Sequence, residues 1–348
     1  MALILLGIDE AGYGPLLGPL SVGAAALRAG NWSDGDPAPD FWKLLSKAVC
    51  KEPREAKGAN PRIPVADSKK LKLANSVTTR HPLVHLERAV LSFMRFAEGA
   101  APDLPADDAA LFEVLGVELE RRPWYQEVKP VSVPVGSTAQ SIAIGSNPLG
   151  AALEAASVDC LGLWCRAIGE TRFNSVVGET GSKADATVIA IGEYLRMAFE
   201  KWGSGERGDL RVVCDRQGGR TDYGPMLARE CRSRADAATR WTASVKVLEE
   251  SDRCCRYEVH DRTRRMVVTF MPEAESAHMS VALASMVAKF VRELAMARFN
   301  RYWCSRAIES AKIDLKPTAG YRQDAARWLE DARDLLTPDD RRTLIRNA

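Results

Sequence analysis

Apolar and polar residues follow one another along the 348-residue chain in blocks that predict strands first, then helices interleaved with single strands. The apolar stretch Ala2 to Ile8 predicts a buried strand, and Ser21 to Leu27, after a turn rich in Gly and Pro, predicts its antiparallel neighbour. Further strands are expected at 210–214, 242–248, 255–259 and 266–270, and helices at 84–97, 148–168, 184–202, 281–299, 324–332 and 339–345. This order predicts an α/β domain with a mixed sheet.

Composition is that of a soluble globular protein, with 46% hydrophobic and 27% charged residues. No eighteen-residue apolar run is present, which disfavours a membrane span. The first residues lack a basic leader, so they are not expected to form a signal peptide, and a cytoplasmic location is expected. Eight Cys residues without a CxxC pair suit a reducing compartment and make structural zinc unfavourable.

The formal net charge of +2 conceals an asymmetry between the two parts of the chain. Residues 1–200 hold 20 Lys and Arg against 24 Asp and Glu, a net of −4, and the remaining residues hold 28 against 22, a net of +6. A basic second part is compatible with a phosphate-backbone partner, and a solvated surface explains it equally well.

The strongest local signal is the pair Asp9 and Glu10 at the end of the first apolar strand. Burying two carboxylates is costly unless a cation neutralises them. Side chains alternate along a strand, so both acids reach one site only if the strand ends between them. Gly12 and Gly14 permit such a departure and a close backbone approach to a ligand. A solvated acidic hairpin turn is the alternative interpretation.

Two later segments present polar groups in similar settings. Asp215 ends the apolar stretch 210–214, either beside the first acid pair or as an ordinary turn residue. On the predicted helix 281–299, Ser285, Lys289 and Glu293 are spaced by four residues and share one side, with Arg292 beside them. The alternative for that stripe is an exposed helix face with a Lys–Glu pair.

Two further groups are candidates for contact with a nucleic acid. Lys69 and Lys70 follow an Asp-Ser turn, a combination suited to phosphate, although a solvated loop is the commoner explanation. Tyr321 follows Gly320 and either stacks on a base or sugar or fills the core.

Together these segments resemble ribonuclease HII, the type 2 ribonuclease H family, in their order along the chain. The motifs are Asp-Glu-Ala-Gly-x-Gly-Pro at 9–15, Asp-Ser-Lys-Lys-Leu at 67–71, the strand-end acid at 215, Ala-Ser-Met-Val-Ala-Lys at 284–289 with Arg-Glu at 292–293, and Gly-Tyr at 320–321. The resemblance implies a single ribonuclease H-like domain over residues 1–348, with a mixed central sheet flanked by helices and insertions near 30–64, 98–140 and 240–280.

The resemblance also implies a site and an activity. The catalytic carboxylates would be Asp9, Glu10, Asp215 and Glu293, holding two magnesium or manganese ions that hydrolyse the RNA strand of RNA–DNA hybrids or a ribonucleotide-containing duplex. The substrate-binding residues implied are Gly12, Tyr13, Gly14, Lys69, Lys70, Ser285, Lys289 and Tyr321.

Two residues depart from the family pattern. Tyr13 replaces an Arg between the two glycines, which weakens the expected grip on phosphate, and Glu293 replaces an Asp. Two other functions therefore remain open: a metal-dependent nuclease of the same fold acting on structured DNA or another RNA, and a non-catalytic nucleic-acid-binding module.

Overall fold

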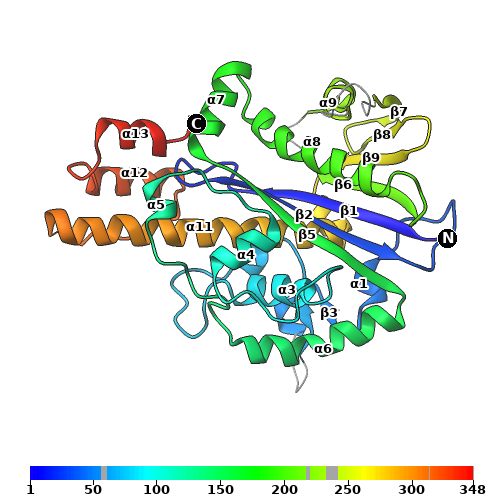
Figure 1. Ribbon diagram of the computed structural model, residues 1–348, viewed down its shortest axis with the longest axis horizontal. Helices are drawn as coiled ribbons and strands as arrows, with labels where there is room; N and C mark the ends of the chain where they lie inside the picture. The colour runs from blue at the N-terminus through cyan, green and yellow to red at the C-terminus, as the bar shows by residue number, and fades with distance from the viewer. Residues whose placement is uncertain (56–60, 217–219, 233–241, 313, 348) are drawn as a thin grey trace.

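A seven-stranded mixed sheet forms the centre of the computed structural model, which describes residues 1–55, 61–216, 220–232, 242–312 and 314–347 (Figure 1). The strand order is β5-β2-β1-β6-β9-β8-β7. The central strands β1, β6 and β9 are parallel, and the other neighbours pair antiparallel. The strand bounds are β1 Leu3–Ala11, β2 Leu20–Ala29, β5 Val158–Ile168, β6 Asp209–Asp215, β7 Ser244–Glu250, β8 Cys255–His260 and β9 Arg265–Met271, with a separate short pair β3 Val49–Cys50 and β4 Ile63–Pro64.

Helices cover both faces of this sheet. One apolar core lies between the sheet and α8, and another lies between the sheet and the side of α11 that also contacts α3. The two layers are visible above and below the strands in Figure 1. The helix bounds are α1 Phe41–Leu44, α2 Ser68–Leu71, α3 Val84–Met94, α4 Asp108–Leu115, α5 Pro123–Gln126, α6 Ala139–Ala155, α7 Glu170–Thr180, α8 Lys183–Trp202, α9 Gly224–Glu230, α10 Ala274–Ala277, α11 Met279–Ala311, α12 Arg322–Asp331 and α13 Pro338–Leu344.

The predicted mixed α/β architecture is confirmed, and it is the helix-flanked mixed sheet that the resemblance implies. The hairpin of the first two strands forms as expected, with Leu3 paired to Ala29 and Ala11 to Ser21. The helix predicted at 281–299 is longer, running over 279–311. Over the described residues, no helix combines the length and the hydropathy that crossing a membrane requires.

The helix predicted over 148–168 is wrong in its second half. Helix α6 ends at Ala155, and β5 runs from Val158 to Ile168 along β2. This strand carries apolar residues toward both faces, and such a continuous apolar run has the same appearance in a sequence as a buried helix.

The three segments that the sequence resemblance predicts to be insertions have different roles in the fold. Residues 240–280 supply β7, β8 and β9, which extend the central sheet beyond β6. Residues 30–64 contain α1 and the β3–β4 pair, and residues 98–140 contain α4 and α5. Whether these segments are additions to a smaller common domain stays a proposal.

Helix α11 lies directly against the first two strands. A Cβ atom at Gly7 would overlap backbone atoms of Ser280 and Val281, and one at Gly23 would overlap the carbonyl of Ala284. Glycine is therefore required at both positions for this close approach. These contacts fix the position of α11 along β1. They therefore also fix where side chains of α11 lie relative to the end of that strand.

Candidate active site

Three acidic residues stand at the carboxyl edge of two adjacent parallel strands. Asp9 and Glu10 are near the end of β1, and Asp215 is the last residue of β6. Ile8 is paired with Cys214, so the residues that follow, Asp9 and Asp215, are neighbours. The crevice at the carboxyl ends of parallel strands is where open α/β sheets bind ligands.

Strand β1 does not end between the two acids, contrary to what we expected. Glu10 still pairs with Val22 and Ala11 with Ser21, so the ladder keeps this segment regular. Side chains of a regular strand alternate between the faces. Asp9 therefore lies on the α11 side and Glu10 on the α8 side.

Electrostatics at this edge favour the arrival of a cation. Asp9 is 9% exposed, and burial, followed by the charge of Glu10, raises its pKa well above the ordinary value. Asp215 raises the pKa of Asp9 further, while the hydroxyl of Ser285 and the amide of Glu10, which donates to Asp9 Oδ1 over 2.8 Å, oppose the rise. Burial also raises the pKa of Asp215, against a 3.2 Å hydrogen bond from the Ala274 amide.

Sequence reasoning missed a fourth acid at this edge, Glu275 on the short helix α10. Burial raises its pKa, and the nearby charges of Asp215 and Asp67 raise it further, while Lys69 lowers it. Glu275 thus belongs to the same electrostatic cluster as Asp215. Its segment, Pro-Glu-Ala-Glu-Ser at 272–276, has no strand or helix periodicity, so only its position just before the predicted helix could have pointed to it.

Glu293 stands elsewhere. It lies eight residues beyond Ser285 on α11, a rise of about 12 Å at 1.5 Å per residue. Its carboxylate is 2.7 Å from Lys289 Nζ and 4.0 Å from Lys72 Nζ. The structure therefore brings Asp9 and Asp215 together, with Glu10 close enough on the other face of β1 to raise the pKa of Asp9, and it places Glu293 two turns farther along α11, between two lysines.

The Asp-Ser turn before Lys69 and Lys70 adjoins the acids. Asp67 caps α2 by accepting from the Lys69 amide over 3.0 Å. Ser68 is buried, and its Oγ is hydrogen-bonded to Ser285 Oγ over 3.0 Å, which ties this turn to α11. Both lysine side chains are exposed, and the charge of Lys69 reaches Asp215 and Glu275.

Farther along α11, Lys289 contacts Tyr321. The ammonium donates to the phenol oxygen over 3.3 Å and lies 5.5 Å from the ring centroid, with the Arg292 guanidinium 5.4 Å from the same ring. The Tyr321 side chain is nevertheless 46% exposed. It presents an accessible aromatic surface held by two cations, and so it is not a core residue.

The turn that follows the acid pair combines a packed glycine with an open one. Gly12 has a φ of +91°, and a Cβ there would overlap the side chain of Arg292. Gly14 has no atom near its missing Cβ and is exposed. Between them, Tyr13 is partly buried, and burial and then the charge of Glu10 raise its pKa while Arg220 and Arg346 lower it.

The donor set at the edge is chemically suited to a hard divalent cation, because Asp9, Glu10, Asp215 and Glu275 all offer carboxylate oxygens. Within the described ranges, however, no three or more His, Cys, Asp or Glu side chains are arranged to hold a metal ion. The raised pKa values of three of these acids are the observation that fits an incoming cation.

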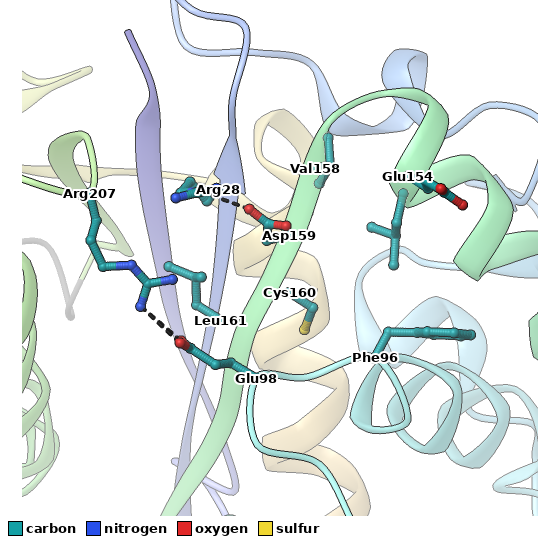
Figure 2. Close-up of a pocket in the computed structure, with 10 residues that line it drawn as sticks. Arg28, Phe96, Glu98, Glu154, Val158, Asp159, Cys160, Leu161 and Arg207 are labelled. Carbon is teal, nitrogen blue, oxygen red and sulfur yellow. Dashed lines mark hydrogen bonds and ion pairs between the residues drawn. The ribbon is translucent and has the colours of Figure 1, made fainter. Parts of the chain in front are cut away.

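A pocket at the opposite end of the sheet is a poorer candidate. It has a volume of about 500 Å³ and lies beside Val158 at the start of β5 (Figure 2). Its arginines are already neutralised: Arg28 pairs with Asp159 at 2.7 Å, and Arg207 pairs with Glu98 at 2.9 Å. Neither arginine is therefore free to bind an anion, and among the charged residues described there only Glu154 has no ion pair.

Comparison with known proteins gives matches only at the level of structure. No family model and no curated protein matches the sequence. Ribonuclease HII from Archaeoglobus fulgidus, solved in a complex with PCNA, aligns with a TM-score of 0.40 and 11% identity over 99% of this chain and 93% of its own. Ribonuclease H2 from Pyrococcus horikoshii gives 0.41 and 12% over 99% and 92%.

A third similar structure is Bst-RNase HIII in complex with Mn²⁺, with a TM-score of 0.39 and 14% identity over 98% of this chain and 64% of its own. This chain is similar in structure to ribonucleases HII and HIII. The alignments extend over nearly all of its length.

Proposed function

We propose that this protein is a divalent-metal-dependent endonuclease of the type 2 ribonuclease H kind, which hydrolyses the RNA strand of RNA–DNA hybrids or cuts a ribonucleotide-containing duplex. The observation that carries the proposal is the position of Asp9, Glu10 and Asp215 at one sheet edge, where burial and then the charges of Glu10 and Asp215 raise the pKa of Asp9. A divalent cation bound beside Asp9 would favour its ionised form and so lower its raised pKa.

The residues that would hold magnesium or manganese are Asp9, Glu10, Asp215 and Glu275. Glu275 takes the place that the sequence resemblance gave to Glu293, because Glu275 shares an electrostatic environment with Asp215. Two bound ions in such a site supply activation of the attacking water and stabilisation of the leaving oxygen.

The chain's own groups position the reaction and its substrate. The Ser285 hydroxyl stabilises the ionised form of Asp9 and ties α11 to the Ser68 turn. Lys69 and Lys70 are exposed, and their ammonium groups would contact the phosphate backbone of a bound nucleic acid. Tyr321, held by Lys289, offers a face for stacking on a sugar or base.

The Gly12–Gly14 turn supplies backbone amides that would recognise the 2′-hydroxyl, which both donates and accepts hydrogen bonds. Tyr13 contributes a single hydroxyl and a ring, not a forked cation. Discrimination between RNA and DNA is therefore expected to be weaker than with an arginine at this position.

A second candidate function, a nuclease for structured DNA or another RNA, is favoured by this same Tyr13. One experiment separates the two. The protein is incubated with Mg²⁺ or Mn²⁺ and labelled RNA–DNA hybrid, DNA with one embedded ribonucleotide, plain DNA and plain RNA. Preferential cleavage at ribonucleotides supports the proposal, equal cleavage of plain DNA transfers it to the second function, and binding without cleavage indicates a non-catalytic module.

A further inference from the structure

The turn between β1 and β2 accepts hydrogen bonds from two buried arginines, Arg292 and Arg346, that come from distant parts of the chain. Arg346, two residues beyond α13, is only 2% exposed. Its Nη1 donates to the carbonyls of Gly12 at 2.6 Å and Gly18 at 3.4 Å, and its Nη2 donates to the carbonyl of Tyr13 at 2.9 Å. Its own amide donates to the Leu16 carbonyl over 2.8 Å.

These contacts decide which way the peptides of the turn face. In a planar trans peptide, the C=O and the following N–H point in opposite directions. Since the carbonyls of Gly12 and Tyr13 point inward to Arg346, the amides of Tyr13 and Gly14 point away from it. No described residue accepts a hydrogen bond from either amide. Two adjacent free amides form an anion-binding concavity, here three residues from Glu10.

Burying the two guanidinium groups beneath this turn costs desolvation free energy. Arg346 and Arg292 are both buried, and burial together with the like charge of Arg292 lowers the pKa of Arg346 to about 10. Arg346 thus stays charged at neutral pH. Arg292 Nη2 donates to the Leu17 carbonyl over 3.1 Å, while Arg292 Nε and Nη1 and Arg346 Nε have no partner among the described residues. A buried guanidinium partnered by neutral carbonyls recovers little of its desolvation cost.

Residues of α7 hold Arg346 and its two neighbours in place. Its guanidinium lies 4.0 Å from the centroid of the Phe173 ring on α7. Asn174 brackets the residue, donating from Nδ2 to the Ile345 carbonyl over 2.8 Å and accepting from the Asn347 amide over 2.6 Å. The position of the guanidinium is therefore fixed by the chain itself, without a bound ligand.

We propose that Arg346 is a positioning residue for the proposed hydrolysis, which orients the Tyr13 and Gly14 amides toward a phosphate or sugar group of the substrate beside Asp9 and Glu10. The inference rests on the proposed function. Arg346 does not contact the reacting atoms, and its effect is on the binding of the nucleic acid.

The test compares Arg346→Met and Arg346→Lys with Arg342→Met, a matched control. Arg342 lies on α13, four residues before Arg346; its side chain is 77% exposed and pairs only with Asp339 among the described residues. Steady-state cleavage of a labelled RNA–DNA hybrid is expected to show a KM raised 10-fold or more in Arg346→Met with kcat within 3-fold. Arg346→Lys should recover part of the loss, since a lysine donates to carbonyls without the fork.

Hydrogen exchange measured without substrate gives an independent readout. In Arg346→Met the amides of Leu16 and Leu17, which donate to the Gly320 carbonyl, should exchange at least 10-fold faster, while those of β1 and α11 keep their protection. If Arg346→Met does not fold, Asn174→Ala, which keeps the arginine but frees its segment, should show the same two changes at smaller size.

An unchanged KM in a folded Arg346→Met protein would overturn the inference, as would unchanged exchange in the turn or equal effects in the Arg342→Met control. If the wild-type protein cleaves none of the duplexes, the proposed function fails, and the exchange measurement alone then decides whether Arg346 orients the turn.

Discussion

The two ends of the central sheet treat acidic residues in opposite ways. At the end where β5 begins, Asp159 pairs with Arg28 and Glu98 with Arg207 (Figure 2). At the carboxyl edge of β1 and β6, Asp9 has Glu10 and Asp215 as its charged neighbours. Acidic residues therefore pair with arginines at one end of the sheet, and at the other end three of them lie close to one another.

The pKa shifts follow this difference. A hydrogen bond from Arg207 lowers the pKa of Glu98, whereas burial and neighbouring acids raise that of Asp9. An acid that its own chain has paired with arginine is a structural feature. Neighbouring acids that raise the pKa of a buried carboxyl favour the binding of a cation, and this distinction separates the candidate site from the pocket beside the start of β5.

The largest difference is expected from two neutralising substitutions, one at each end of the central sheet. Asp215→Asn should keep the fold and reduce metal-dependent cleavage by more than the roughly 10–100-fold associated with outer partners of metal ligands. Glu98→Gln should leave the rate of hybrid cleavage unchanged. Cleavage rates at saturating Mg²⁺ measure both, and an active Asp215→Asn enzyme would remove the proposed site.

A second pair of substitutions distinguishes the two candidates for the fourth acid. Glu275→Gln should lower cleavage about 10–100-fold and raise the Mg²⁺ concentration needed for half-maximal rate. Glu293→Gln should leave that Mg²⁺ dependence unchanged, because its carboxylate pairs with Lys289. Metal titrations of the initial rate give the answer. The reverse ranking would restore Glu293 to the site.

Stability without metal should depend on pH in a direction set by the raised pKa values of Asp9, Asp215 and Glu275. Unfolded carboxyls titrate near pH 4, so the folded protein retains protons that the unfolded chain releases. This stability is fully present below about pH 4 and is lost as pH rises through the raised folded-state values.

Denaturant titrations across pH, with and without Mg²⁺, test this expectation. At pH 8, an ion at 100 times its Kd should raise the free energy of unfolding by about 2.7 kcal/mol. Asp9→Asn should flatten the pH dependence of the metal-free protein. A metal-free protein that becomes more stable from pH 5 to 8 would contradict the assignment of these acids.

The smallest effect is expected at the paired end. Breaking the partly exposed Arg207–Glu98 pair by Glu98→Gln should cost between 0 and about 1 kcal/mol of unfolding free energy. The cost should shrink in high salt, because exposed charges are screened. A larger loss would show that the paired end carries more of the stability than its exposure indicates.

The sequence predicted the parts of this molecule that local patterns encode. The first hairpin and β6 are short apolar runs next to turn residues, the long helix after residue 279 has helical spacing, and Asp9, Glu10 and Asp215 stand at or near the ends of those runs. Strand β5 was not recognised, because its apolar run follows α6 after only two residues, with no Gly or Pro to separate strand from helix.

The remaining site residues depend on contacts between distant parts of the chain. Glu275 reaches Asp215 only because β9 runs parallel to β6 and directs the chain that follows it into α10 at the same edge. Arg346 meets Gly12 across 334 positions of the sequence. No local periodicity carries either relation.

The contact of Gly7 and Gly23 with the α11 backbone has a consequence for how the protein tolerates change. At these two points helix and sheet are separated by no more than a hydrogen atom, so even a methyl group would act as a wedge. Such a wedge would lift Ser285 away from Asp9 without altering any polar group. In a saturation mutagenesis screen scored by activity, two glycines in the middle of apolar strands would therefore resemble catalytic residues, although neither carries a side chain.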